Sequence, residues 1–156
     1  MKRITIVPAL AALAVVIALA AVGTISKHAV PAVYAAGGCS NATLNGNYSF
    51  IQPAGFTTHN STTGNEVPWQ FVGVETFDGK VKTTVSYTAA VDGAIYQNQA
   101  SAGTYNVNPN CTGSLTFTEG DAAGLIFNIA ISGGGAEVFA ISTNSGDTAT
   151  VVEKKQ

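Results

Sequence analysis

The stretch KVKTTVSYTAAVDG, residues 80–93, has the clearest alternation in the chain. Every second residue from Val81 to Val91 falls on one face, which carries Val81, Thr83, Val85, Tyr87, Ala89 and Val91. Lys82, Thr84, Ser86 and Thr88 fall on the other. A period of two over this length predicts a half-buried strand and argues against a helix. The following Asp92-Gly93 predicts a tight hairpin turn.

Similar segments continue on both sides, separated by turn residues. The predicted strands cover 46–52, 68–77, 80–91, 94–101, 103–107, 112–119, 125–132, 137–143 and 149–153. So many short strands must pair all round to leave no exposed edges. The sequence therefore predicts one all-β domain, an antiparallel up-and-down barrel of about eight strands, with a β-sandwich as the alternative. No helix longer than one turn is expected after Ala36.

A hydrophobic leader precedes this domain. Lys2 and Arg3 are followed by an apolar run over residues 4–25, and small residues surround Ala35. The basic start, the apolar run and the small residues at the −3 and −1 positions of Val33-Tyr34-Ala35-Ala36 predict a leader helix and a signal peptide over residues 1–36, cleaved after Ala35 or Ala36, with the barrel domain at 37–156. Two alternatives stay open: an uncleaved membrane anchor, and a lipoprotein acylated at Cys39.

The chain contains only two cysteines, Cys39 and Cys111. An even number of cysteines in an exported chain predicts a disulfide. Closing a loop of about 72 residues stabilises the fold by roughly 4 kcal/mol in the chain-entropy model. A redox or metal pair is the alternative, although no histidine or third cysteine is placed to assist it.

Charged residues are scarce, at 10% of the chain against a usual share of about 25%. After the leader, four lysines face all nine acidic residues, a formal charge near −5 (4 minus 9). Nucleic-acid binding is not expected, because it needs clustered cations. A neutral, hydroxyl-rich surface is typical of a secreted, periplasmic or cell-envelope protein, which would meet a membrane only through an uncleaved leader.

Three motifs carry a resemblance to other proteins. They are Cys39-Ser40 with Leu44-Asn45-Gly46-Asn47-Tyr48, then Thr76-Phe77-Asp78-Gly79, and Gly103-Thr104-Tyr105-Asn106-Val107 with Cys111-Thr112-Gly113. This pattern resembles a group of small exported bacterial proteins, and it implies location and fold rather than chemistry. The chain is also similar to calycin and allene oxide cyclase-type barrels, a likeness that implies a barrel-closing role for Gly46-x-Tyr48.

The strand at 68–77 has two possible orientations. Trp69, Phe71, Glu75 and Phe77 share one parity, and Val72 and Val74 share the other. The favoured interpretation places Val72 and Val74 inside and Glu75 in water. In the alternative, the aromatic residues face inward, and Glu75 is a carboxyl in an apolar lumen with a raised pKa.

A ligand site can be assembled from these inward aromatic residues. Its candidate members are Tyr48, Trp69, Phe71, Glu75, Tyr87 and Tyr105. Phe50 and Gln97 could join the tyrosines, since aromatic side chains with a few polar tips are typical of small apolar ligand sites. Core packing is the favoured interpretation of the tyrosines.

No motif points to catalysis, a metal or a cofactor. His59 stands alone in a polar loop, there is no Gly-x-Ser-x-Gly elbow, and Glu119, Asp121 and Asp147 lie at turns without the twelve-residue calcium pattern. We expect a non-enzymatic exported protein that binds a small apolar ligand or has a structural role in the envelope. The alternatives are a cyclase-type or isomerase-type enzyme using Glu75 and tyrosines, and a self-associating surface protein, because few charges guard its strands.

Overall fold

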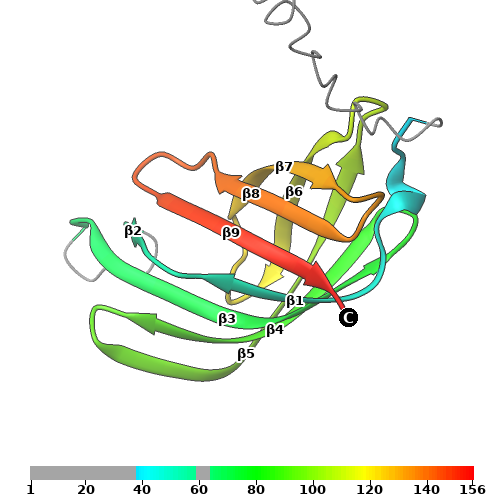
Figure 1. Cartoon of the computed structure of the whole chain (residues 1–156). Helices are drawn as coiled ribbons and strands as arrows, with labels where there is room; N and C mark the ends of the chain where they lie inside the picture. Colours follow the sequence, from blue (N-terminus) through cyan, green and yellow to red (C-terminus); the bar gives the residue numbers. More distant parts are fainter. Residues whose placement is uncertain (1–37, 59–63) are drawn as a thin grey trace, which may run out of the picture. The chain divides into compact units, whose positions relative to one another are not determined.

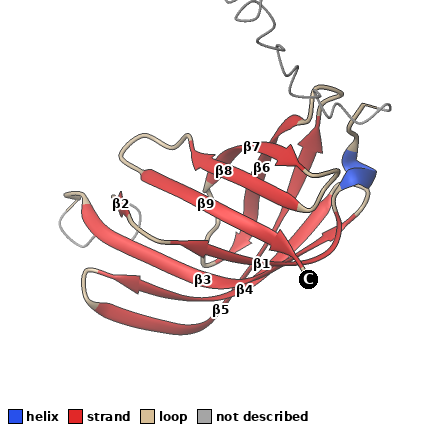
Figure 2. Ribbon diagram, viewed as in Figure 1, coloured by secondary structure: helices blue, strands red, loops and turns tan. Residues whose placement is uncertain are grey.

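Eight antiparallel strands close into a barrel in the computed structural model, which describes residues 38–58 and 64–156 (Figure 1; Figure 2). The wall consists of β1 (Asn45–Gln52), β3 (Val67–Asp78), β4 (Lys82–Val91), β5 (Ala94–Val107), β6 (Thr112–Gly120), β7 (Ile126–Ser132), β8 (Glu137–Ser142) and β9 (Thr148–Lys155). This architecture confirms the predicted all-β up-and-down barrel. The predicted leader, its membrane-anchor alternative and His59 lie outside the described residues. The lipoprotein alternative requires a free Cys39 thiol, whereas Cys39 is bonded to Cys111.

The first strand closes the circuit by pairing on both sides. Tyr48 lies opposite Glu75 of β3, and Phe50 lies opposite Glu153 of β9. After an interruption at Pro53 and Ala54, the short β2 (Gly55–Thr57) continues the same wall position and again pairs with β3 and β9. The interruption is expected at a proline, which cannot donate a ladder hydrogen bond.

One predicted boundary was wrong. The segments 94–101 and 103–107 form a single strand, β5, with a register shift against β6 between Ala102 and Gly103. A bulge bends a strand without ending it. Glycine is needed here because a Cβ on Gly103 would lie 2.2 Å from the carbonyl oxygen of Thr116. The sequence prediction also missed β2, which is only three residues long.

Both predicted Asp-Gly turns are present. The Asp78 carboxylate accepts hydrogen bonds from the backbone N–H groups of Lys80, Val81 and Lys82, at 2.8–2.9 Å. Asp92 and Gly93 have φ values of 50° and 81°. Two successive positive φ values match the twist of a two-residue hairpin.

A short N-terminal segment closes one end of the barrel. It contains the 3₁₀ helix η1 (Asn41–Thr43), and the next residue, Leu44, is fully buried. The Tyr105 hydroxyl donates to the Leu44 carbonyl oxygen at 3.0 Å, and the Asn41 side-chain oxygen accepts from the Val107 N–H at 2.7 Å. Across the same end, the Tyr48 hydroxyl donates to the Gly135 carbonyl oxygen at 2.6 Å.

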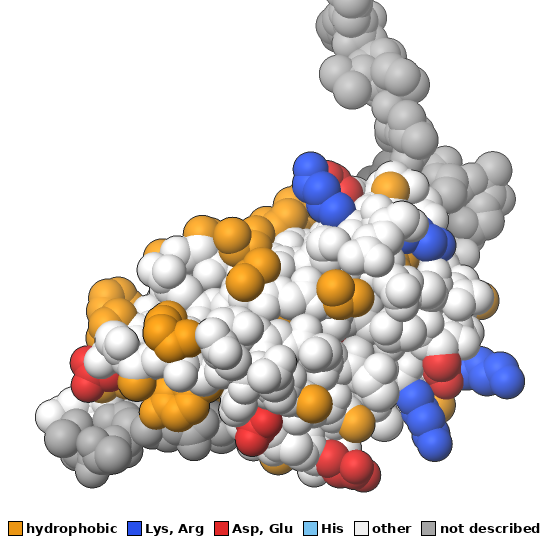
Figure 3. Space-filling model, turned by 90° about the horizontal axis from the view of Figure 1, so that it is seen from below, with side chains coloured by type: hydrophobic (Ala, Val, Ile, Leu, Met, Phe, Trp, Pro, Cys, Tyr) orange, Lys and Arg blue, Asp and Glu red, His pale blue; other side chains and the backbone are white. Residues whose placement is uncertain are grey.

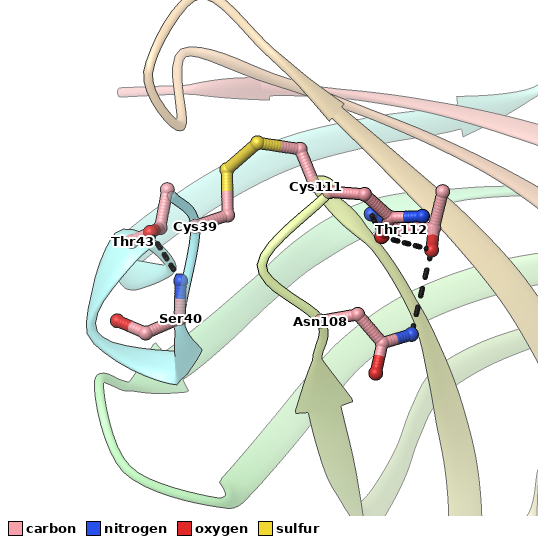
Figure 4. Close-up of a disulfide and its surroundings, with 7 residues drawn as sticks. Cys39, Ser40, Thr43, Asn108, Cys111 and Thr112 are labelled. Atoms are coloured by element: carbon pink, nitrogen blue, oxygen red, sulfur yellow. Dashed lines mark hydrogen bonds between the residues drawn. A yellow bond between two sulfur atoms is a disulfide. The ribbon is translucent and has the colours of Figure 1, made fainter. Parts of the chain in front are cut away.

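The predicted disulfide holds this closing segment in place. Cys39 and Cys111 are bonded, with their Cα atoms 4.9 Å apart, and the bond joins the segment before η1 to the β5–β6 turn (Figure 4). Nearby, the Cys39 N–H donates to the Pro109 carbonyl oxygen at 3.2 Å. In residues 38–58 and 64–156 no helix has the length and apolar character needed to cross a membrane.

The outer wall is mostly uncharged. Figure 3 shows one face, on which apolar side chains stand in several separate groups among uncharged polar ones, with few lysines and acidic residues. Most of the aromatic and large aliphatic side chains of the wall strands are buried in the interior, towards which alternate residues point.

Candidate functional site

Glu75 lies inside the barrel. Only 3% of its surface is exposed, whereas Val72 is 53% exposed on the outer wall. The favoured interpretation, with Val72 inside and Glu75 in water, was therefore wrong. Trp69 and Phe77 share the parity of Glu75 and are buried with it. Each aromatic side chain buries about 150–250 Å², so the gain from enclosing the aromatic residues exceeds the cost of enclosing one carboxyl.

The lumen contains two adjoining cavities. The inner one has a volume of about 40 Å³ and is almost wholly apolar, and the outer one measures about 640 Å³. Glu75 lines the inner cavity, while Gln99 and Asp121 line the outer one. Five side chains border both cavities: Trp69, Phe71, Tyr87, Ala122 and Leu125. These five shared residues, called the constriction below, lie where the inner and the outer chamber adjoin.

The β6–β7 loop contributes two sides of the constriction. Ala122 and Leu125 are both buried although they belong to a turn. The loop is fastened to β5, because the Ala122 N–H donates to the Ser101 hydroxyl oxygen at 2.7 Å and the Asp121 N–H donates to the Ala100 carbonyl oxygen at 3.2 Å. The loop therefore acts as a fixed partition.

Two carboxyl groups lie at the inner end of the lumen. Glu75 on β3 accepts a 2.6 Å hydrogen bond from the Thr83 hydroxyl, and Glu153 on β9 is only 1% exposed. Strand β1 separates them, with Tyr48 opposite Glu75 and Phe50 opposite Glu153. Burial raises the pKa of Glu75 to about 7. Burial and the nearby charge of Glu75 raise the pKa of Glu153 well above its ordinary value.

Three buried polar atoms in this region have no hydrogen-bond partner among the described residues. They are Oε2 of Glu153, Oε1 of Gln52 and Nε1 of Trp69. The amide nitrogen of Gln52 does donate to the Trp69 carbonyl oxygen, at 3.2 Å. Of these three residues, Trp69 lines both chambers, whereas Gln52 and Glu153 line neither. Unsatisfied buried groups are costly and uncommon.

The three tyrosines have different positions. Tyr48 and Tyr105 lie at the closed end, where their hydroxyls bond backbone carbonyls. They line neither lumen cavity, in keeping with the core packing favoured for them. Tyr87 is half-buried and lines both chambers. Of the six candidate residues, the structure therefore brings together Trp69, Phe71, Glu75 and Tyr87.

Sequence reasoning placed the wrong glutamine near the lumen. Gln97 is exposed, and Gln99 lines the outer chamber instead. The cause is a register shift: Tyr87 pairs with Gln99, but Ala89 pairs with Tyr96. The extra residue changes the parity of β5, and Asn98 at the shift has a positive φ of 56°.

Several lining residues were not proposed as site members from sequence. Phe117 and Phe127 were identified only as regular strand residues, and Ala122 only as part of a turn. For Glu153 the sequence does contain one signal of an inward position, since this residue continues the alternation of Ala149 and Val151.

No three or more His, Cys, Asp or Glu side chains within residues 38–58 and 64–156 lie close enough together to hold a metal ion. At the turns, the Asp147 carboxylate accepts from the Thr57 hydroxyl at 2.5 Å, and the Asp121 carboxylate accepts from the Ala100 N–H at 3.2 Å.

No protein family, curated protein or solved structure matches this chain. The class of protein is therefore defined by fold and site alone. It is a closed eight-stranded antiparallel barrel, fastened at one end by a disulfide, with an apolar lumen that contains buried carboxyls.

Proposed function

We propose that this protein binds a small apolar ligand inside the barrel and is exported to act outside the cytoplasm. The observation that carries the proposal is the pair of adjoining chambers bordered by Trp69, Phe71 and Tyr87. Concave sites lined by apolar and aromatic side chains with a few polar groups are the usual form of small-molecule sites.

The difference between the two barrel ends supports this proposal. One end is covered by η1, the disulfide and the Tyr48–Gly135 hydrogen bond. The larger chamber lies towards the other end, beside the Gly120–Leu125 loop and Tyr96 of the β4–β5 hairpin. A ligand would therefore enter past Tyr96 and extend inward through the constriction.

The disulfide supports the proposed location. Disulfides persist in oxidising surroundings such as the periplasm or the extracellular space. The Cys39–Cys111 bond is compatible with either, and the leader pattern of residues 1–36 points the same way.

An enzyme of cyclase or isomerase type is the second candidate. It is favoured by one observation, the position of Glu75 on the inner chamber with a pKa near 7. Such a group is suited to proton transfer near neutral pH. Tyr48 and Tyr105 are engaged by backbone carbonyls, so Tyr87 is the tyrosine placed to assist. Chemical conversion of a bound ligand, followed by mass spectrometry, would distinguish an enzyme from a binding protein.

The sequence-based expectation of self-association depended on unguarded strand edges. Closure of the barrel pairs most of these edges. Each wall strand pairs on both sides over at least part of its length, but β5 pairs with β6 only from Ser101 onward. Among the described residues, no strand pairs with the β6-facing edge of residues 94–99, so association could use this edge as well as outer side chains. A row of apolar side chains crosses four adjacent strands on the outer wall: Val72 on β3, Ile51 on β1, Val152 on β9 and Phe139 on β8. A structural role in the envelope, or self-association, would use this row of side chains.

Ligand binding can be tested by thermal stabilisation. Octanol is a suitable neutral probe, and a ligand that binds the native state raises the melting temperature. Ala122→Leu fills the constriction and should abolish most of the shift. Ala130→Leu is the matched control, because Ala130 lies exposed on the outer wall of β7. If octanol raised the melting temperature of both variants equally, the ligand would bind outside the constriction.

A further inference from the structure

We propose that the lumen selects apolar amines over fatty acids and other apolar anions, with Glu75 and Glu153 recognising the ammonium group at the inner end. This inference rests on the proposed function and specifies its ligand class.

The lumen contains acidic groups with no basic partner among the described residues. Glu75 lines the inner chamber and Glu153 is buried beside β1. All four lysines outside the leader are exposed. Lys155 contacts the closed end from outside, where its Nζ lies 5.9 Å from the centre of the Tyr48 ring.

The other titratable groups around the pair are tyrosines. Tyr48 lies on β1, Tyr87 on β4 and Tyr105 on β5, and burial raises the pKa of all three. They therefore stay neutral at physiological pH. Asp121 adds a further carboxylate at the outer chamber. The complete path from opening to inner end is thus neutral or negative.

Glu153 supplies an independent sign that the pair is a ligand contact. Its Oε2 atom is buried without a hydrogen-bond partner among the described residues. The Thr83 hydroxyl donates to one oxygen of Glu75, whereas no described residue donates to Oε2 of Glu153. An ammonium group has three donors and a positive charge. It therefore matches the acceptor capacity left on Glu75 in the inner chamber and on Glu153, which lines neither chamber but lies near enough to Glu75 for their charges to interact.

The inner chamber suits the reach of an ammonium group. Its volume of about 40 Å³ accommodates a narrow head, whereas the outer chamber of about 640 Å³ accommodates an apolar body. A carboxylate ligand entering head first would meet Glu75 at close range. Above pH 7 Glu75 is mostly ionised. Like charges in a poorly hydrated site repel strongly, so fatty acids are rejected under these conditions.

Three probes of equal chain length test the selection: octylamine, octanol and octanoate. At pH 8 we expect octylamine to bind at least about tenfold more tightly than octanoate, the change produced by one favourable charge contact. Raising the pH from 6 to 8 should tighten octylamine binding as Glu75 loses its proton, and should leave octanol binding unchanged.

Two variants assign the effect to the pair. Glu75→Gln and Glu153→Gln should each reduce the octylamine-to-octanoate ratio while octanol binding persists, which also shows that the barrel is folded. Glu119→Gln is the control, because it removes the same charge from an exposed position. Octanoate binding equal to that of octylamine would overturn the selection alone. Failure of all three probes to bind would overturn the proposed function itself.

Discussion

Glu75 shows how a single buried carboxyl gives the lumen its chemistry. It lies between Trp69 and Phe77 in the inward parity of β3, and Thr83 supplies its one side-chain hydrogen bond. A carboxyl in this position is held partly protonated near neutral pH by loss of hydration. The protein therefore retains a group that lowers its stability at neutral pH, which is typical of a functional residue.

The pKa of Glu75 predicts how stability depends on pH. Its ordinary value is 4.5 and its folded value is about 7. Between these values the unfolded chain has lost the proton that the folded chain keeps, so the free energy of unfolding falls as pH rises. The loss is complete above pH 7 and amounts to roughly 3 kcal/mol at most.

We expect the melting temperature to fall between pH 5 and pH 8, and Glu75→Gln to reduce that fall. Scanning calorimetry at several pH values measures both. Glu119→Gln should behave like the unaltered protein. A melting temperature that rises over this range in the unaltered protein would contradict the burial of Glu75.

Tyr105 is expected to matter for closure rather than for the ligand. Tyr105→Phe removes the hydrogen bonds to the Leu44 and Asn41 carbonyl oxygens. Unfolding by urea should show a loss of about 1 kcal/mol, while octanol affinity stays the same. A large change in octanol affinity with unchanged stability would instead place Tyr105 in the ligand site.

The strands and the closing segment depend on a few positions where backbones come close. A Cβ on Gly73 would lie 2.2 Å from the Ser86 carbonyl oxygen and 2.7 Å from the Cβ of Tyr87. Glycine thus allows β4 to approach β3 and positions Tyr87 at the constriction.

Gly73→Ala is expected to destabilise the barrel by about 2 kcal/mol or more, since backbone must move to admit the methyl group. Equilibrium unfolding in urea measures the loss. Ala130→Leu provides a comparison, because it enlarges a side chain on the exposed outer wall. Equal stability of the two variants would contradict the close β3–β4 approach.

The disulfide should contribute more than any single hydrogen bond of the closing segment. Its sequence separation is 72 residues, which corresponds to roughly 4 kcal/mol in the chain-entropy model. The Cys39→Ser/Cys111→Ser double variant should lose about this much in urea unfolding. Unchanged stability would show that hydrogen bonds and packing hold η1 without the covalent link.

For the full chain, the leader prediction has a direct test. We expect the protein recovered from outside the cytoplasm to begin at Ala36 or Gly37, with both cysteines oxidised. Intact mass measures both properties at once. A mass that includes residues 1–36 would indicate an anchor, and a lipid adduct on Cys39 would indicate a lipoprotein.

Local patterns were sufficient for the secondary structure, the barrel, the two Asp-Gly turns and the disulfide. Alternation and turn residues act between near neighbours, so they can be read along the chain. The bulge that joins residues 94–107 into one strand was missed because its cause, the approach of Thr116 to Gly103, is a contact between strands.

Only the tertiary structure determined which parity of β3 faces inward, and with it the position of Glu75. Periodicity shows that two faces differ, but the choice between them depends on the summed burial of all eight strands around one closed lumen. The same holds for the pairing of Glu75 with Glu153, which are 78 residues apart and become neighbours because β1 pairs with both β3 and β9. Local alternation therefore predicted the barrel, whereas the chambers and the Glu75–Glu153 pair exist only because the strands close around one lumen.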